Sequence, residues 1–249
     1  MKKILIAAFA CLVLAASMAG CQRAANELVM ATNAEFEPFE YLEGGKIVGF
    51  DVEIAEYIAE ELGMTLKIDN MEFNAVLAAV PSGKADMGIS AMSIKPDRLE
   101  VMDFSDPYFT AYQAVIVKSD NTAITKGDDL AGKKIGVQLG TTGDTLVSTT
   151  YEPQGAEISR YAKGSEAMID LMSGKIDAIV IDNSPAEKLS AANPGTKVLD
   201  EPLDEVEEYA IAVKKGNKDL LDKINAALAK MKSTGKYDEI YEKYFPSEE

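Results

Sequence analysis

The spacing of apolar residues in the first third of the chain predicts alternating strands and helices. Residues 28–32 form an apolar run typical of a buried strand, and apolar residues after Asp51 recur at helical spacing until Gly63. We expect Asp51 to cap this helix and Gly63 to end it. The next predicted elements are a strand, a helix and a strand, at 65–68, 74–80 and 86–89. The resulting β-α-β-α-β order favours a parallel sheet with right-handed crossovers.

A similar pattern restarts in the middle of the chain, after a longer strand predicted at 112–118. Strands and helices then alternate again, at 134–137, 165–172, 176–181 and after Pro185. Ser82-Gly83-Lys84 and Ser173-Gly174-Lys175 each lie between a predicted helix and a strand. This repetition suggests two α/β lobes built on the same unit. Coincidence is the alternative, because Ser-Gly-Lys is a common helix-ending turn.

The last part of the chain predicts a loop, a strand and two helices. We interpret the acidic stretch 200–208 as a solvated loop, followed by a strand at 209–213. A helix predicted at 218–233 carries one apolar stripe. A shorter helix after it carries Tyr237, Ile240, Tyr241 and Tyr244. Such stripes are typical of helix faces that pack on a core.

The first twenty residues are predicted to be a signal peptide. Two lysines precede an apolar run from Ile4 to Ala16, which is shorter than the roughly 20 residues that span a membrane. Met18-Ala19-Gly20-Cys21 resembles a bacterial lipobox, so we expect cleavage before Cys21 and a lipid on its sulfur; ordinary secretion is the alternative. Residues 21–27 would then tether the protein outside the cytoplasmic membrane, with the lipid as its only membrane contact. Cys11 would leave with the signal peptide, so we expect no disulfide.

Composition excludes several classes of chemistry. The 249 residues include no His and only two Cys, which rules out imidazole bases, His-containing triads, His-ligated metals and four-thiolate metal sites. We expect no metal and no cofactor. The formal charge of −16, from 25 basic and 41 acidic residues, argues against binding to nucleic acid.

Polar and aromatic residues follow the predicted strands, at the sheet edge where α/β proteins bind ligands. The candidates are Asn33, Phe36, Phe73, Ser90, Ala91, Met92, Ser93, Arg98, Gln138, Thr142 and Asp182. Taken singly, each is more simply a surface cation, a turn residue or a core residue. Their joint placement after successive strands indicates a binding site.

Together these residues could hold a free α-amino acid. The guanidinium of Arg98 suits a carboxylate, as do the N–H groups where Gly140-Thr141-Thr142-Gly143 opens a helix. Asp182 and the backbone carbonyl of Ser90 suit an ammonium group, and Ser93 adds a hydroxyl. The rings of Phe36 and Phe73 could sandwich the aliphatic part of a side chain.

Six stretches of the chain match the motifs of one protein family, in the same order. They are Pro38-Phe39-Glu40-Tyr41, Val48-Gly49-Phe50-Asp51-Val52, Ser93-Ile94-Lys95-Pro96-Asp97-Arg98, Asp103-Phe104-Ser105-Asp106-Pro107-Tyr108-Phe109, Leu130-Ala131-Gly132-Lys133-Lys134-Ile135-Gly136-Val137 and Gly235-Lys236-Tyr237-Asp238-Glu239-Ile240-Tyr241. Over essentially the whole chain after the signal peptide, the sequence resembles a family 3 extracellular solute-binding protein. Such proteins are the polar amino acid receptors of ABC importers.

The resemblance implies a two-lobed periplasmic-binding-protein type II fold, in which two α/β lobes joined by two hinge strands close over the ligand. Lobe 1 would comprise residues 28–110 and 211–249, and lobe 2 residues 115–208. The hinge strands would lie near 110–115 and 208–211. A closed, ligand-bound monomer would then dock on a membrane permease, on the cell surface or in the periplasm.

The resemblance also implies roles for individual residues. Arg98 matches the carboxylate-binding arginine, Thr142 the residue whose amide caps that carboxylate, and Asp182 the ammonium-binding acid. Phe36 and Phe73 match the stacking aromatics.

One departure from the family pattern concerns the ligand side chain. Receptors for basic amino acids and glutamine commonly carry an Asp shortly after the first strand, where this chain has Asn33. Ala91 and Gln138, which also face the ligand side chain, are uncharged. We therefore expect a neutral polar side chain, such as that of glutamine, asparagine or cysteine, in preference to a basic one.

Two other function classes remain open from the sequence. An enzyme on the same fold, similar to dehydratases that act on carboxylic acids, would need a carboxylate over its substrate, and Glu35, Glu37 and Glu40 lie near the expected cleft. A receptor domain that feeds a signalling protein is the third alternative. Asp182 favours an amino acid that is held unchanged, so we expect a binding protein and no catalysis.

Overall fold

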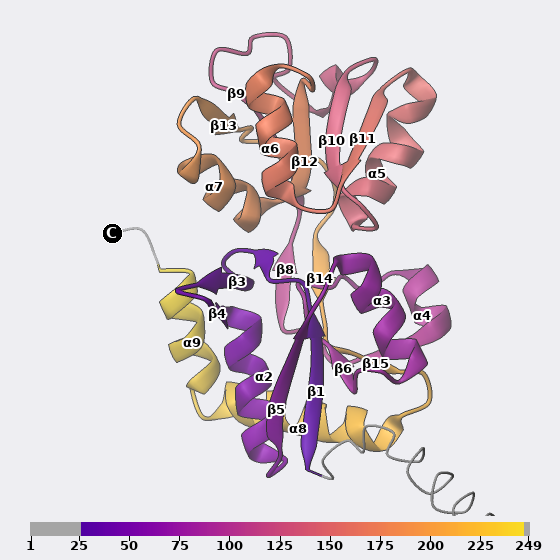
Figure 1. Cartoon of the computed structure of the whole chain (residues 1–249), viewed down its shortest axis with the longest axis vertical. Helices are drawn as coiled ribbons and strands as arrows, with labels where there is room; N and C mark the ends of the chain where they lie inside the picture. The colour runs from indigo at the N-terminus through magenta and orange to yellow at the C-terminus, as the bar shows by residue number, and fades with distance from the viewer. Residues whose placement is uncertain (1–25, 247–249) are drawn as a thin grey trace, which may run out of the picture.

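The computed structural model describes residues 26–246, which form two α/β lobes stacked along the long axis of the molecule (Figure 1). The predicted signal peptide, residues 1–20, and the predicted lipidation site, Cys21, lie outside the described residues. Within 26–246 there is no helix long and apolar enough to cross a membrane.

The first lobe is built on a five-stranded sheet in the order β5-β1-β6-β15-β7. Its strands are β1 (Glu27–Thr32), β5 (Thr65–Asn70), β6 (Met87–Gly88), β7 (Met102–Phe104) and β15 (Ala212–Lys214). β1 pairs in parallel with β5 and β6, whereas β15 runs antiparallel to β6 and β7. The predicted parallel unit is therefore present, and a strand from late in the chain completes its sheet.

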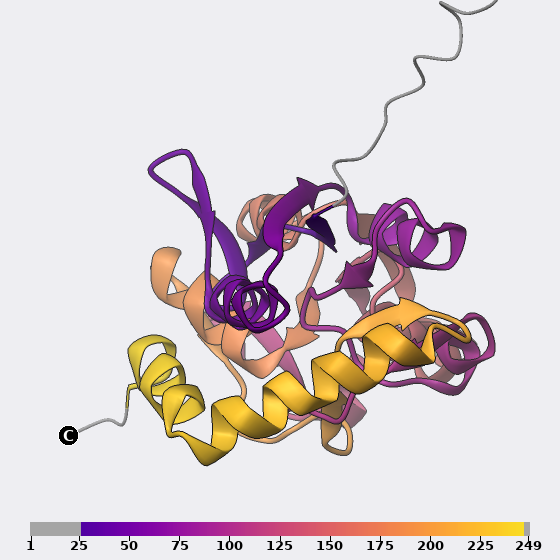
Figure 2. The same cartoon turned by 90° about the horizontal axis from the view of Figure 1, so that it is seen from below.

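Five helices and a small sheet surround this core. The helices are α2 (Phe50–Glu61), α3 (Phe73–Ser82), α4 (Pro96–Val101), α8 (Lys218–Ser233) and α9 (Lys236–Tyr244). The small sheet consists of β2 (Glu35–Phe36), β3 (Glu40–Glu43) and β4 (Lys46–Val48). Both α8 and α9 pack on α2. Helix α8 crosses the first lobe on the side that faces away from the second lobe (Figure 2). The apolar stripe predicted for residues 218–233 is the buried face of α8.

The second lobe repeats the arrangement with a sheet in the order β11-β10-β12-β9-β13. Its strands are β9 (Gln113–Lys118), β10 (Lys134–Gln138), β11 (Glu157–Tyr161), β12 (Ala178–Asp182) and β13 (Thr196–Val198). Its helices are α5 (Thr142–Thr150), α6 (Gly164–Ser173) and α7 (Asn183–Ala192), with short 3₁₀ turns at Gly127–Leu130 and Glu152–Gln154. β10 is parallel to β11 and β12, and β9 is antiparallel to β12.

The two Ser-Gly-Lys segments occupy equivalent places in the two lobes. Gly83 ends α3 with φ 75°, and Gly174 ends α6 with φ 78°. A positive φ at the residue after a helix favours glycine, which has no Cβ to clash. The repetition in the sequence thus corresponds to the same helix-ending turn, used once in each lobe.

A two-stranded antiparallel sheet joins the lobes (Figure 1). It pairs β8 (Phe109–Ala111) with β14 (Glu207–Tyr209). The single strand predicted at 209–213 was wrong, because the chain leaves this connecting sheet after Tyr209 and enters the first lobe's sheet as β15. The interpretation of 200–208 as a solvated loop was also wrong at its end, since Glu207 is only 5% exposed.

Asp51 does not cap α2, contrary to the prediction. The N-cap is Gly49, with φ 138°, and a Cβ there would lie 2.0 Å from the carbonyl oxygen of Phe39. Only glycine fits this close approach. Asp51 instead lies in the first turn of α2 and is fully buried. Its carboxylate accepts hydrogen bonds from the Tyr108 hydroxyl and from the Ala91 amide, which partly offset the cost of burying it.

An aromatic cluster ties the start of α2 to the connecting sheet and to the end of the chain. Phe50 is fully buried, and its ring lies 5.3 Å from that of Phe245, 5.9 Å from Phe109 and 5.7 Å from Tyr237. All three of these ring pairs meet edge to face, a geometry that aromatic quadrupoles favour. The cluster therefore fixes α9 against the first lobe.

We expect Phe50→Ala to lower the free energy of unfolding by about 3–5 kcal/mol, because it removes a fully buried ring and leaves a cavity. Chemical denaturation checks this. Ile169→Ala on α6, where the side chain is 68% exposed, is the control and should change the value by less than about 0.5 kcal/mol. Equal losses in the two variants would contradict an anchoring role for the cluster.

Candidate functional site

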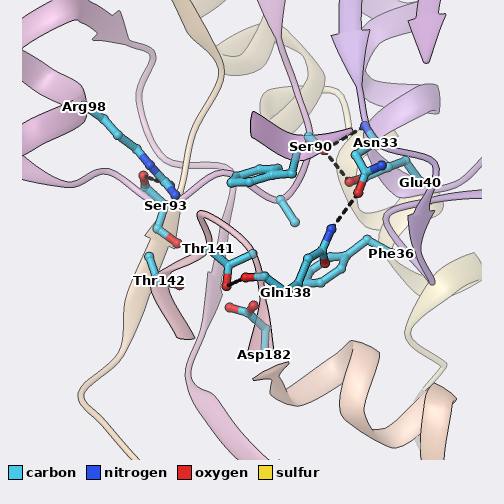
Figure 3. A pocket seen from close by; sticks show the side chains of 12 residues that line it. Asn33, Phe36, Glu40, Ser90, Ser93, Arg98, Gln138, Thr141, Thr142 and Asp182 are labelled. Atoms are coloured by element: carbon cyan, nitrogen blue, oxygen red, sulfur yellow. Dashed lines mark hydrogen bonds between the residues drawn. The ribbon is translucent and has the colours of Figure 1, made fainter. Parts of the chain in front are cut away.

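A cavity lies between the two lobes. Both lobes supply its lining, which consists of Asn33, Phe36, Glu40, Phe73, Ser90, Ala91, Ser93, Arg98, Gln138, Thr141, Thr142 and Asp182 (Figure 3). Many of these residues follow the carboxyl ends of β1, β6, β10 and β12, where the sequence predicted a site.

The structure brings together all the predicted site residues except Met92. The Met92 side chain is fully buried in the apolar cluster that includes Val76 and Val80. Neighbouring side chains of an extended segment point in opposite directions, so Ser93 faces the cavity while Met92 faces the core. Two further lining residues, Thr141 and Glu40, were not among the eleven candidates. The sequence had placed Thr141 only in the segment that opens a helix, and Glu40 only near the cleft as a possible carboxylate of the enzyme alternative.

Arg98 presents a buried positive charge to the cavity. The residue lies in α4 and is 7% exposed. Its Nη1 donates to the Ser93 carbonyl at 2.9 Å, its Nη2 donates to the Gly140 carbonyl at 3.3 Å, and its guanidinium lies 5.4 Å from the Phe73 ring centre. None of these partners is a carboxylate, and within residues 26–246 Arg98 forms no ion pair. Burial lowers the pKa of Arg98, but a guanidinium remains charged.

Asp182 presents a buried acidic group to the same cavity. It ends β12 and is 4% exposed. Its Oδ1 accepts a hydrogen bond from Gln113 Nε2 at 2.8 Å, and within the described part of the chain it has no ion-pair partner. Burial, followed by repulsion from Glu207, raises the pKa of Asp182 to about 7. The carboxyl therefore changes its charge near neutral pH.

The N-terminus of α5 is held against the cavity by a set of hydrogen bonds. Thr141 Oγ1 accepts from the Asp144 amide at 3.2 Å and donates to the Gln138 carbonyl at 2.8 Å. Asp144 accepts from the Gly140 amide at 3.0 Å and from Arg160 Nε at 2.8 Å. The first N–H groups of a helix lack intrahelical acceptors and carry partial positive charge, so this end favours an anion.

A polar network connects the cavity to the sheet between the lobes. Gln113 Nε2 donates to Thr142 Oγ1, Asp182 Oδ1 and Glu207 Oε1, at 3.0, 2.8 and 3.1 Å. Ser93 Oγ donates to Glu207 Oε2 at 2.5 Å. Gln113 and Glu207 were missed by sequence reasoning, because an isolated glutamine and one glutamate of an acidic run carry no local signal of burial.

Oxygen acceptors gather at the end of the cavity near Asn33. Its Nδ2 donates to the Met71 carbonyl at 2.9 Å, which leaves its Oδ1 to accept from Gln138 Nε2 at 2.8 Å. Gln138 Oε1 is buried, and no hydrogen-bond donor to it is found among the described residues. The ring of Phe36 lies beside these groups (Figure 3). This end of the cavity therefore suits a ligand group that donates hydrogen bonds.

Two buried carboxyl groups lie behind that end. Ser90 Oγ accepts from the Asn33 amide at 3.1 Å and donates to Glu40 Oε1 at 2.7 Å (Figure 3). Asp51 Oδ2 accepts from the Ala91 amide at 2.7 Å, and Ala91 has φ 44°, an unusual value for a residue other than glycine. Glu40 and Asp51 are hydrogen-bonded to each other. Burial raises the pKa of both, that of Glu40 well above its usual range and that of Asp51 to about 6.

Among residues 26–246, no group of three or more His, Cys, Asp and Glu side chains is arranged to hold a metal ion. The carboxyl groups around the cavity instead face amide, hydroxyl and carboxyl partners, as described above.

Comparisons with known proteins agree on one family. The sequence profile of the bacterial extracellular solute-binding proteins, family 3, matches residues 28–247. The arginine-binding extracellular protein ArtP of Bacillus subtilis (strain 168) is 33% identical over the full length of both chains. An ancestral arginine-binding protein bound to arginine is 43% identical, with a TM-score of 0.86, over 90% of this chain and 100% of the other. An ancestral arginine-binding protein bound to glutamine is also 43% identical, with a TM-score of 0.84, over 90% of this chain and 99% of the other.

We expect Asp144→Ala to lower the free energy of unfolding by about 1–3 kcal/mol, because it leaves the partly buried Gly140 amide without this acceptor and Arg160 without its partner. Denaturant titration measures the loss. Asp219→Ala is a matched control, since Asp219 also lies in the first turn of a helix but pairs with Lys223 on the surface. A loss no larger than that of the control would contradict the bracing role of Asp144.

Proposed function

Because the chain belongs to the bacterial extracellular solute-binding proteins of family 3, we propose that it binds a free L-α-amino acid between its lobes and delivers it to the permease of an ABC importer. The relatives are named as binding proteins, and the chain is accordingly a solute-binding protein and not an enzyme. The dehydratase-like alternative raised by the sequence is set aside on this ground.

One observation carries the proposal: two opposite charged groups are buried on the same small cavity, and neither has an ionic partner in residues 26–246. Burying a charge is costly unless it is paired and hydrogen-bonded. The α-carboxylate of an amino acid would pair with Arg98 and the N-terminus of α5, while its ammonium group would pair with Asp182. A single zwitterion therefore satisfies both protein groups at once.

The side chain of the ligand would extend toward Asn33 and Gln138. The acceptors there support a side chain that donates hydrogen bonds, such as the amide of glutamine or the guanidinium of arginine. Of these two ligands, glutamine has the neutral polar side chain that we expected from Asn33. Structures of ancestral arginine-binding proteins bound to arginine and to glutamine support testing the two ligands side by side.

Closure of the lobes would couple binding to transport. Contacts that join the lobes across the cleft within residues 26–246 include Arg98 to the Gly140 carbonyl, Gln138 to Asn33, and Lys163 to Glu35 at 2.5 Å. A ligand that bridges the same surfaces would bias the equilibrium toward the closed form, which the permease would recognise. We propose hinges near 110–115 and 208–211, with lobe 1 at 28–110 and 211–249 and lobe 2 at 115–208.

The rest of the proposal concerns the cellular setting. The protein would act as a monomer outside the cytoplasmic membrane, on the cell surface or in the periplasm. A lipid on Cys21 would be its only membrane attachment. Mass spectrometry of the cell-expressed protein would detect the lipid on this residue.

We expect the refolded, ligand-free protein to bind L-glutamine or L-arginine in isothermal titration calorimetry. Arg98→Ala should weaken that binding by about 3–5 kcal/mol, because it leaves the ligand carboxylate buried without its cation. Lys67→Ala, which removes an exposed cation on β5, should leave the affinity unchanged. Near-normal affinity in Arg98→Ala would exclude the carboxylate role, and no binding of any amino acid would exclude the proposed function.

We expect the affinity for glutamine to fall as the pH is lowered from 7.5 to 5.5. The pKa of Asp182 is raised to about 7, so the ligand-free site gains a proton over this range and loses the charge that would hold the ammonium group. The decrease approaches about tenfold per pH unit below that pKa. Asp182→Asn should bind weakly at both pH values, with a flat profile. The same slope in wild type and Asp182→Asn would show that another group is responsible.

A further inference from the structure

We propose that Glu40 and Asp51 act as a carboxyl pair with a single negative charge, and that the protonation state of this pair sets the preference of the cleft between cationic and neutral side chains. The inference rests on the proposed function, because it concerns the side-chain end of the same amino acid site. It assigns a specificity role to Asp51, which the sequence predicted to be a helix cap, and to Glu40, which the sequence placed near the cleft only for the enzyme alternative.

The geometry of the pair requires a shared proton. Glu40 Oε2 and Asp51 Oδ1 are fully buried, and neither accepts a hydrogen bond from an amide, hydroxyl or ammonium group in the described part of the chain. The two carboxyl groups are hydrogen-bonded to each other, and two carboxylates can do so only if one of them carries a proton. The pair therefore holds at most one negative charge while this contact exists.

The other oxygen of each carboxyl group is held by a separate set of donors. Glu40 Oε1 accepts from Ser90 Oγ, and Asp51 Oδ2 accepts from Tyr108 Oη and the Ala91 amide. These bonds leave Glu40 Oε2 and Asp51 Oδ1 as the oxygens without such a donor in the described residues. Glu40 itself lines the cavity beside Asn33, so a charge on the pair lies next to the ligand side chain and not in a remote part of the core.

The pair is surrounded by few ionisable groups, and we expect it to titrate within the pH range in which binding can be measured. The ionisable groups whose charges act on it are the hydroxyls of Tyr108, Tyr209 and Tyr237 and the carboxyl of Asp182 across the cavity. Arg98 and Glu207 act on Asp182. Burial raises the pKa of both carboxyl groups, that of Asp51 to about 6 and that of Glu40 well above its usual range. We therefore expect the pair to gain its first negative charge as the pH rises through about 6.

A cationic ligand side chain would favour the charged form of the pair, since an opposite charge nearby stabilises ionisation. Binding arginine would therefore release a proton from the pair in mild acid, and its affinity would rise with pH. Glutamine would not interact with the charge in this way. Asp182 also titrates, but it faces the ammonium group that both ligands share, so its effect cancels from the ratio of their affinities.

The experiment measures the dissociation constants of L-arginine and L-glutamine for the full chain between pH 5 and 8. In the wild type, the preference for arginine over glutamine should rise by about tenfold through pH 6, as expected for a shift of one pKa unit. Calorimetry in buffers of different ionisation enthalpy should show more protons released with arginine than with glutamine at pH 5.5.

Two amide variants test whether the pair is the cause. In Glu40→Gln the amide NH₂ replaces the shared proton and donates to Asp51, and in Asp51→Asn it donates to Glu40. Each single variant keeps one carboxyl group that still titrates, so each should keep a preference for arginine that rises with pH. The double variant Glu40→Gln/Asp51→Asn has no carboxyl group left in the pair, so its preference for arginine should be weaker and should not change with pH. These substitutions preserve the hydrogen bonds to Ser90, Tyr108 and Ala91, which limits the risk of misfolding.

The outcomes separate this inference from the proposed function. A wild-type arginine preference that is flat with pH, or a pH-dependent preference that persists in the double amide variant, would overturn the role of the pair while leaving the amino acid receptor intact. If the double variant fails to fold, the wild-type proton release still decides. Binding of neither ligand at any pH would reject the proposed function itself.

Discussion

The structure depends on two opposite charges that are buried on one cavity without being paired to each other. A guanidinium and a carboxyl group in this position are costly in the absence of a ligand, because desolvation is not offset by an ionic partner. Hydrogen bonds within the protein offset part of this desolvation cost. Arg98 donates to two backbone carbonyls, and Asp182 accepts from Gln113. A raised pKa at Asp182 and a lowered pKa at Arg98 are consequences of the same burial.

The polar network around these charges also links the cavity to the connection between the lobes. Glu207 belongs to β14, and its two carboxylate oxygens accept from Ser93 of the first lobe and Gln113 of the second. Glu207 is also the charge that, after burial, raises the pKa of Asp182. The electrostatics of the ligand site and the geometry of the connecting sheet therefore share one residue. Such sharing is a physical route by which ligand contacts could influence the relative position of the lobes.

The side-chain end of the cavity has a different construction. Asp51 does not cap its helix. Its carboxylate accepts a hydrogen bond from the Ala91 amide, and this bond helps to keep Ala91 at a positive φ. Backbone conformations of this kind persist only where surrounding contacts over-determine them. Ser90, Glu40 and Tyr108 complete that set of contacts. Two acidic groups whose burial costs stability thus shape the loop that lines the cavity, a trade between stability and function that binding sites commonly show.

The sequence by itself determined the elements and the edge at which the cavity lies. Periodic apolar residues predicted α8 at its observed bounds, and the order of strands and helices placed Arg98, Gln138 and Asp182 after strands whose carboxyl ends converge. Family motifs added the two-lobed fold.

Only the tertiary structure decided which polar residues are buried and what they contact. Glu40, Gln113 and Glu207 come from separate strands, and Asp51, Met92 and the strand expected at 209–213 were misread. The reason is physical. Hydrophobic periodicity reports which face of an element turns inward, whereas the burial of a carboxyl or amide group depends on partners that folding brings from distant parts of the chain.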